Sequence, residues 1–135
     1  MISDSQIIIP DAKGNNRVDS LSNIIENGKV GLLFLIPGID ETLRINGSAY
    51  LSTDKNYLDL FTSEKNTPKS AIVITIEELF LHCAKAFMRS KLWDVSAQIN
   101  RNEFPTMGQM LKDQLGSDGT PESRDAMVAR YKKDL

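Results

Sequence analysis

Apolar and polar residues alternate over the first two thirds of the chain in a way that predicts strands. Residues 6–10, "QIIIP", are rich in β-branched side chains and end at proline, which is a strand signal. Residues 30–36, "VGLLFLI", form a continuous apolar run typical of a buried strand. Residues 42–52, "TLRINGSAYLS", alternate strictly, which predicts one core face and one polar face. The pattern therefore indicates a mainly β protein with short helices inserted.

The alternation assigns each residue of 42–52 to a face of its strand. The core face is expected to carry Leu43, Ile45, Gly47, Ala49 and Leu51, and the polar face Thr42, Arg44, Asn46, Ser48 and Tyr50. Glycine weakens a strand interior, so Asn46-Gly47 predicts a bulge or a close approach of another backbone.

Helical patterns are short. Residues 17–27 are expected to form a helix that Asn16 can cap and Gly28 ends. Its apolar stripe comprises Val18, Leu21, Ile24 and Ile25. A second short helix over 52–61 has Thr53 as its expected cap. The segment 70–94 predicts a long strand to about Leu81 and then a short helix.

The last third of the chain is helical in character. Residues of about 104–115 and 122–133 each predict an amphipathic helix, and "GSDGT" separates them. Four apolar residues are spaced to pack on the rest of the protein or on a partner subunit: Leu111, Leu115, Met127 and Tyr131.

Composition and charge limit the classes of function. Hydrophobic residues make up 41% and charged residues 25%, as in soluble globular proteins. The net charge of −2 gives no reason to expect nucleic acid as a partner. The single cysteine, Cys83, excludes an intramolecular disulfide, and no apolar run approaches the roughly 20 residues of a membrane span. Since the start also lacks a basic signal segment, we expect a cytoplasmic protein that does not bind membranes.

Four stretches of the sequence carry a family resemblance. They are "IIIPDAKGNNRVDSLSNII", "KVGLLFLIPGIDETLRINGSAYLSTD", "IEELFLHCAKAFMRSKLWD" and "FPTMGQMLKDQLG". In this order they resemble the pyridoxamine 5'-phosphate oxidase-related, FMN-binding split-barrel family, and more closely its bacterial branch of FMN-dependent flavoproteins. The resemblance implies a split β-barrel over residues 1–95 and a helical extension over 96–135 that packs on the barrel or on a partner subunit.

The resemblance also carries expectations about assembly. Family members have further strands before the point that matches residues 6–10, and these strands supply part of the flavin site. A barrel without them would be partial and would have unpaired, association-prone strand edges. The family further implies a homodimer with FMN near the subunit interface. We expect that interface to be apolar and of the obligate size class, about 2,000 Å² or more.

The segment 14–17, "GNNR", allows two interpretations. Asn16 could simply cap the following helix. Alternatively, the free N–H groups of a helix start, with donors from Asn15, Asn16 and Arg17, would suit the phosphate of FMN. In related flavoproteins a basic segment before the equivalent helix contacts the FMN phosphate or ribityl chain. The resemblance therefore favours the phosphate interpretation and adds Ser20, in the first helical turn, to the candidates.

Thr42 and Arg44 are candidates for contact with the flavin ring. In the wider oxidase family a glutamine-containing strand makes that contact, and Thr42 takes the place of the glutamine. The alternative for both residues is the solvated face of an ordinary two-faced sheet.

Further candidates follow the long strand. The sole histidine, His82, could touch cofactor or substrate, but no cluster with metal-ligand spacing surrounds it, so no metal site is expected. Cys83 is expected to be a small buried residue. Lys85 and Arg89 are four residues apart and could meet an anion on one helical face. Trp93 could stack on a flavin ring or belong to the core.

The resemblance implies an FMN-dependent oxidoreductase whose substrate the sequence does not identify. A flavin carries its own redox chemistry and needs few acid–base side chains, so no catalytic residue is assigned. The segment "ETLR" departs from the arginine–glutamine pair of the true oxidases, which argues against pyridoxamine phosphate oxidation itself. Two alternatives stay open: another cofactor on the same fold, such as a deazaflavin or haem, and a non-catalytic dimeric remnant that binds no flavin.

Overall fold

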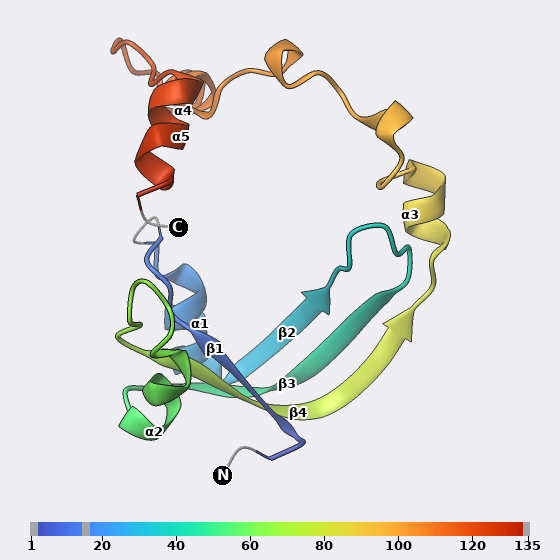
Figure 1. Ribbon diagram of the computed structural model, residues 1–135, viewed down its shortest axis with the longest axis vertical. Helices are drawn as coiled ribbons and strands as arrows, with labels where there is room; N and C mark the ends of the chain where they lie inside the picture. The colour runs from blue at the N-terminus through green and yellow to red at the C-terminus, as the bar shows by residue number, and fades with distance from the viewer. Residues whose placement is uncertain (1–2, 15–16, 134–135) are drawn as a thin grey trace. The chain divides into compact units, whose positions relative to one another are not determined.

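The computed structural model describes residues 3–14 and 17–133. Its elements in chain order (Figure 1) are β1 (Gln6–Pro10), α1 (Asp19–Asn27), β2 (Lys29–Phe34), β3 (Thr42–Ser52), α2 (Lys55–Leu58) with a 3₁₀ turn (Asp59–Phe61), β4 (Ala71–His82), α3 (Lys85–Ser90), two 3₁₀ turns (Val95–Ala97, Arg101–Glu103), α4 (Met107–Leu115) and α5 (Arg124–Tyr131). The chain divides into two compact units, Met1–Asp94 and Val95–Leu135, and each is described separately.

The first unit is built on one antiparallel sheet with the strand order β1–β4–β3–β2. β3 and β4 pair along their whole length, from Thr42 opposite His82 to Ser52 opposite Ala71. β1 pairs only with the first five residues of β4, which end at Thr75. Within the described part of the chain, no strand pairs with the outer edge of β4 after that point.

α1 lies against one face of this sheet and closes the core. Ile24 of α1 packs with Ala49 of β3 and Ile74 of β4. Partly buried residues surround this cluster: Ile7, Ile9, Val30, Leu32, Leu51 and Ile72. Val18 and Ile25 of the predicted stripe are exposed. α1 therefore contributes a narrower apolar face than its sequence predicts.

The irregularity predicted at Asn46-Gly47 is confirmed. Asn46 pairs with Glu78 and Gly47 with Ile76, so Glu77 is an extra residue. The bulge therefore lies in β4 and not in β3. A Cβ atom at Gly47 would lie 2.2 Å from the carbonyl oxygen of Thr75, so the predicted close backbone approach is present as well.

α1 begins later than predicted. Its first residue is Asp19, and Val18 holds the N-cap position without a side-chain hydrogen bond. The expected cap, Asn16, lies outside the described residues and before the cap position. The helix end is as predicted, because Gly28 adopts a left-handed φ of 66° and its N–H donates to the carbonyl oxygen of Ile24. The helix is therefore fixed by its packing and its C-cap rather than by an N-cap.

The boundaries around β4 largely follow the sequence. The long strand ending near Leu81 and the short helix after it are both confirmed, with β4 ending at His82 and α3 starting at Lys85. The predicted cap of α2 is wrong by one residue. Asp54, not Thr53, caps this helix by accepting a hydrogen bond from the backbone N–H of Asn56.

The second unit contains α4 and α5, which are shorter than the helices predicted at 104–115 and 122–133. Thr106 and Ser123 are the N-caps, and their side chains accept hydrogen bonds from the backbone N–H groups three residues later. A bidentate ion pair joins Arg130 to Glu122, while Leu115 and Tyr131 are exposed. The side-chain caps thus set where both helices start, and the Arg130 guanidinium carbon lies 4.7 Å from the centre of the Tyr131 ring. None of the described helices is long and apolar enough to cross a membrane.

Candidate functional site

A basic cavity of about 640 Å³ lies at the entry to α1. One wall comes from the segment between β1 and α1, and the other from the loop that precedes β4. Its lining residues are Asp11, Ala12, Lys13, Gly14, Arg17, Val18, Leu21, Lys65, Asn66, Thr67, Pro68 and Lys69. The Ser70 hydroxyl donates to the Asp11 carboxylate over 2.9 Å, and the Asp11 N–H donates to the Ser70 carbonyl over 2.9 Å. These bonds join the two walls.

The charge in this cavity is strongly one-sided. Four cationic side chains line it: Lys13, Arg17, Lys65 and Lys69. Only one carboxylate, that of Asp11, is among the described lining residues. The N-terminus of the nine-residue α1 adds a partial positive charge, although Asp19 in its first turn offsets part of it. Lys13, Arg17 and Lys65 already have partners, so an incoming anion would exchange one set of contacts for another.

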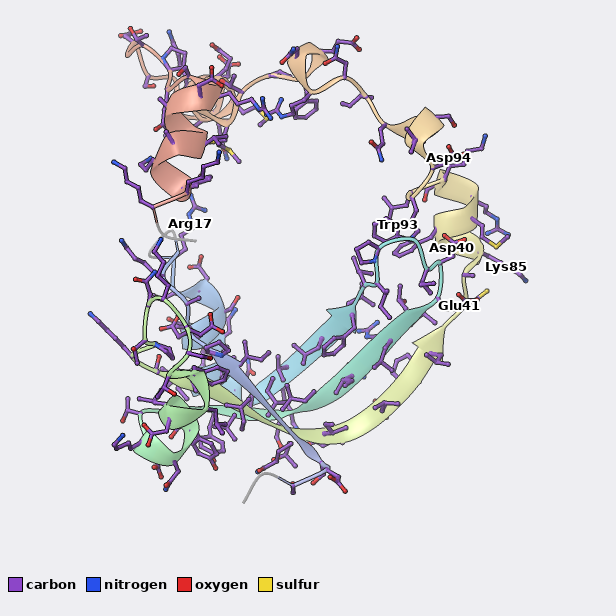
Figure 2. All side chains as sticks on the ribbon, viewed as in Figure 1. Arg17, Asp40, Glu41, Lys85, Trp93 and Asp94 are labelled. Atoms are coloured by element: carbon purple, nitrogen blue, oxygen red, sulfur yellow. The ribbon has the colours of Figure 1, made fainter. Side chains whose placement is uncertain are left out.

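The structure places the "GNNR" candidates unequally. Arg17 lines the basic cavity, and Figure 2 labels its side chain just before α1. Ser20 lies in the first turn of α1 but does not line the cavity. Asn15 and Asn16 lie outside the described residues. Of this predicted set, Arg17 alone is placed at the cavity.

A second cavity, of about 320 Å³, lies where β3 begins and β4 ends. We call it the strand-end cavity. It is lined by Gly31, Leu32, Leu33, Asp40, Thr42, Arg44, His82, Cys83, Ala86 and Phe87. It brings together three predicted site residues, Thr42, Arg44 and His82, from two paired strands. Their neighbours are apolar side chains from β2 and α3.

Thr42 is buried and not on a solvated face as the alternation suggested. It is only 7% exposed. Its side chain has no hydrogen-bond partner among the described residues, although its hydroxyl is not sealed from solvent. Because Thr42 also lines the strand-end cavity, the hydroxyl of this largely buried residue is accessible to a ligand there.

Arg44 and His82 belong to a row of stacked side chains. The Arg44 guanidinium carbon lies 6.0 Å from the centre of the Phe80 ring, at the outer range of a cation–π contact. The Phe80 and His82 rings are 5.4 Å apart and tilted by 37°. The row gives one side of the strand-end cavity both aromatic surface and positive charge.

The remaining candidates lie outside both cavities. Lys85 and Arg89 are exposed on α3. The Trp93 indole N–H donates to the carbonyl oxygen of Ile39 over 2.9 Å. Its ring meets the Phe87 ring edge-on, with centres 6.1 Å apart. Trp93 is therefore fixed against the turn between β2 and β3 (Figure 2), where Asp40 is its neighbour.

Several cavity residues were not singled out from the sequence. Lys13, Lys65 and Lys69 were not among the candidates, and Asp40 was not recognised either. Cys83 was expected to be buried, but it is exposed and lines the strand-end cavity. For Lys13 the adjacent "GNNR" was an available signal. The loop of Lys65 and Lys69 lies about fifty residues away in sequence, so only the fold brings these side chains to Arg17.

The two cavities lie at opposite ends of β4. The basic cavity precedes Ala71, whereas the strand-end cavity includes His82. The strand has 12 residues, which at about 3.3 Å per residue corresponds to roughly 36 Å along its path. The described residues include no group of three or more His, Cys, Asp or Glu side chains that could hold a metal ion.

Comparisons with known proteins agree with this architecture. Residues 1–83 match the family described as pyridoxamine 5'-phosphate oxidase. The crystal structure of HupZ from Group A Streptococcus is 20% identical, with a TM-score of 0.51 over 60% of this chain and 66% of HupZ. A single-substitution variant of HupZ is also 20% identical, with a TM-score of 0.52 over 61% of this chain and 70% of that one. The chain thus spans about two thirds of HupZ, and at this identity the likeness shows the fold alone.

No curated protein matches the sequence. The family match and the structural likeness together confirm the predicted fold class, a mainly antiparallel β domain with short helices. The family match covers well over half of the chain. The chain therefore belongs to the pyridoxamine 5'-phosphate oxidase family.

Proposed function

We propose that the protein is an FMN-dependent oxidoreductase. The observation that carries this proposal is the basic cavity, where four cationic side chains face one carboxylate at a helix start. A phosphate monoester is largely dianionic at neutral pH, and Arg17 can offer it a planar two-point contact. The three lysines add charge that flexible stems can bring to the remaining oxygens. The donor set of this cavity therefore fits the phosphate end of FMN.

The strand-end cavity fits the other end of the cofactor. The pyrimidine edge of a flavin presents two carbonyl oxygens on either side of an N–H group. Arg44 can donate to a carbonyl, the Asp40 carboxylate can accept from the N–H, and the Thr42 hydroxyl can do either. Leu32, Leu33 and Phe87 supply the apolar surface that a fused ring needs.

One FMN molecule cannot reach both cavities of the same chain. The ribityl chain between the ring and the phosphorus has about the reach of three extended residues, whereas the cavities are separated by the whole of β4. We therefore propose that a homodimer shares each cofactor, with the basic cavity of one protomer facing the strand-end cavity of its partner. FMN bound there would carry the electrons, and the protein would position it and tune its electrostatics.

The substrate is not pyridoxamine phosphate in this proposal. Thr42 stands where the oxidases of that substrate have glutamine. Its side chain is shorter by one methylene and the carboxamide carbon, so it cannot make the same contact to the ring. The strand-end cavity, with its exposed Arg44 and His82, suits a small planar or acidic substrate beside the flavin.

Subunit complementation tests the shared site. Arg17→Ala removes a charge-assisted contact and should raise the FMN dissociation constant about ten- to a hundred-fold, while riboflavin affinity stays the same. Arg44→Ala should weaken both flavins. Mixing the two variants creates heterodimers in which one of two sites is intact, so roughly a quarter of all sites should regain native affinity. Arg89→Ala, which removes a cation outside both cavities, is the matched control.

Flavin fluorescence titration reads each outcome. Failure of the mixture to recover any tight sites would show that the two cavities do not cooperate across subunits. Equal FMN affinity in native protein and Arg17→Ala would mean that the basic cavity does not bind the phosphate. A protein that binds neither flavin would favour the non-catalytic alternative.

A second cofactor has one observation in its favour. His82 lines the partly apolar strand-end cavity, and imidazole is a common axial ligand of haem iron. His82→Ala separates the two cofactors, because it should abolish haem binding, whereas FMN would keep its contacts to Arg17 and Arg44 and lose at most part of its affinity. A deazaflavin shares the phosphate end and the pyrimidine edge of FMN, so direct competition with FMN would reveal it.

A further inference from the structure

α3 lines part of the strand-end cavity, but it is short and has no buried residue that would hold it against the sheet. Two of its residues, Ala86 and Phe87, line the cavity. The helix has only six residues, and none of them is buried. A helix this short is not stable without tertiary contacts. Something outside the helix must therefore keep this wall in place.

Trp93 supplies the contacts that α3 lacks. The indole N–H donates to the carbonyl oxygen of Ile39, 54 residues earlier in the chain. The same ring meets Phe87 edge-on, a favourable aromatic geometry. Asp40, the next residue after Ile39, also lines the cavity. The Trp93 side chain therefore links the part of the lining that comes from α3 to the turn that carries Asp40.

The backbone between α3 and Trp93 is shaped for this contact. Lys91 adopts φ 49° and ψ 41°, the left-handed conformation that a non-glycine residue rarely takes. The N–H groups of Lys91 and Leu92 donate to the carbonyl oxygens of Met88 and Phe87. This turn ends α3 and reverses the chain, so that Trp93 returns to Phe87.

We infer that Trp93 is a positioning residue, which fastens α3 to the turn between β2 and β3 and thereby sets the width of the strand-end cavity. The identity of the ligand rests on the proposed function, whereas the fastening of α3 does not. Trp93 acts through Phe87 and Asp40, since it does not line the cavity itself.

The test uses Trp93→Phe, which keeps an aromatic ring against Phe87 but cannot donate to Ile39. Lumiflavin, which has the ring system without ribityl chain or phosphate, probes the strand-end cavity alone. Loss of one hydrogen bond should weaken lumiflavin binding about three- to ten-fold. Inorganic phosphate, assayed by its competition with FMN, should bind the basic cavity unchanged. Leu92→Ala, next to Trp93 in the same turn, is the control. It should change neither the affinity for lumiflavin nor the affinity for phosphate.

Trypsin supplies a readout that does not depend on flavin. Lys85, Arg89 and Lys91 are exposed cleavage sites in and after α3, but cleavage requires the helix to open locally. Cleavage at these three sites, identified by mass spectrometry, should be several-fold faster in Trp93→Phe than in the native protein. Cleavage in the second unit should keep its native rate, which serves as the internal control.

The two readouts separate the possible failures. Faster cleavage with weaker lumiflavin binding supports the inference. Faster cleavage in a protein that binds no flavin, native or variant, supports the fastening role and overturns the proposed function. Unchanged cleavage would overturn the inference, and so would faster cleavage with unchanged lumiflavin affinity. Weaker lumiflavin binding without faster cleavage would instead make Trp93 a direct ligand contact.

Discussion

The two halves of β4 differ sharply although they belong to one continuous strand. Ala71, Val73 and Ile74 in the first half are fully buried. In the second half Leu79 is 58% exposed and Leu81 74% exposed. Both halves pair with β3 and both are apolar in sequence. The difference therefore comes from what covers the sheet and not from the strand itself.

Different neighbours account for the contrast. α1 and β1 cover the first half of β4, and Ile24 of α1 reaches Ile74 there. Beyond the bulge at Glu77, β1 no longer pairs with β4, and the core cluster that includes Ile24 of α1 has no member from this part of β4. A cross-strand row of Phe34, Leu43 and Leu81 then continues on the face that α1 covers elsewhere. The covered half supplies stability, whereas the open half carries the exposed apolar side chains and the strand-end cavity.

The largest expected effect tests the stability of the covered half. Ile74→Ala removes a fully buried side chain from the core and should lower the free energy of unfolding by about 2–5 kcal/mol. Leu81→Ala, in the open half of the same strand, should change it by no more than about 0.5 kcal/mol. Urea unfolding of both variants in dilute solution measures the difference. Similar losses in both would show that the open half also packs within the protomer.

The second effect tests assembly through the open half. We propose that the exposed apolar surface of the open half forms part of the dimer interface. Leu79→Ser with Leu81→Ser removes apolar surface there and should raise the dimer dissociation constant about a hundred-fold. Sedimentation velocity over a range of concentrations measures this constant. Leu60→Ser, an exposed leucine at the other end of the sheet, should leave it unchanged. An unaltered constant in the double variant would place the interface elsewhere.

The third effect tests the boundary between the halves. Gly47→Ala places a Cβ 2.2 Å from the Thr75 carbonyl oxygen, so one of the two strands must shift. Overpacking of this kind costs about 1–3 kcal/mol. Thermal unfolding should show the loss, whereas Gly119→Ala, where a Cβ meets open space, should not. A neutral Gly47→Ala would mean that the bulge tolerates a wider separation of β3 and β4.

The smallest effect concerns the exposed ion pair at the bulge. Hydrogen bonding from the Lys29 ammonium, over 2.9 and 3.0 Å, lowers the pKa of Glu77 below its ordinary value of 4.5. A carboxyl with a lowered pKa in the folded state stabilises the protein above the unfolded pKa. That contribution is lost as the pH falls through the folded pKa. Glu77→Gln should therefore be slightly less stable than the native protein near neutral pH and equally stable in acid.

Urea unfolding at several pH values between about 7 and 3 measures this convergence. In a Lys29→Met background, the same substitution should have a smaller pH-dependent effect, because Lys29 is the main cause of the lowered pKa and the Ser48 hydroxyl is the second. An undiminished pH dependence there would show that Lys29 is not the main cause.

The strands were predictable because each carries its own signal. Alternation identified β3, β-branched residues identified β1 and β4, and Asn46-Gly47 marked the bulge. Local sequence patterns did not show which strand carries the extra residue of the bulge. Glu77 is the extra residue only because of the register in which β4 pairs with β3, and these strands are distant in the sequence. The start of α1 was misplaced for a related reason. A good capping residue, Asn16, preceded it, but packing of Ile24 and the Gly28 cap fix the helix instead.

The candidate site was predictable only in part. The sequence offers three separate candidates for cofactor contact, Thr42, Arg44 and His82. Pairing of β3 with β4 brings these residues together. Arg17 was found from its position before a helix. The sequence showed scattered basic residues, yet the fold gathers Lys65 and Lys69 with Arg17 around one cavity. Such clustering depends on loop contacts about fifty residues apart, which no local pattern reports.

The unpaired outer edge of β4 has a consequence for amide exchange. In an edge strand, alternate N–H groups point to the paired neighbour and the others to solvent. From Glu77 to His82, every second amide should therefore exchange slowly while its neighbours exchange quickly. Between Ala71 and Thr75, where both edges are paired, all amides should be slow. Amide protection along this one strand would thus be uniform from Ala71 to Thr75 and would alternate residue by residue from Glu77 to His82. If assembly made the exchange uniformly slow in the second segment as well, another strand would have paired with this edge.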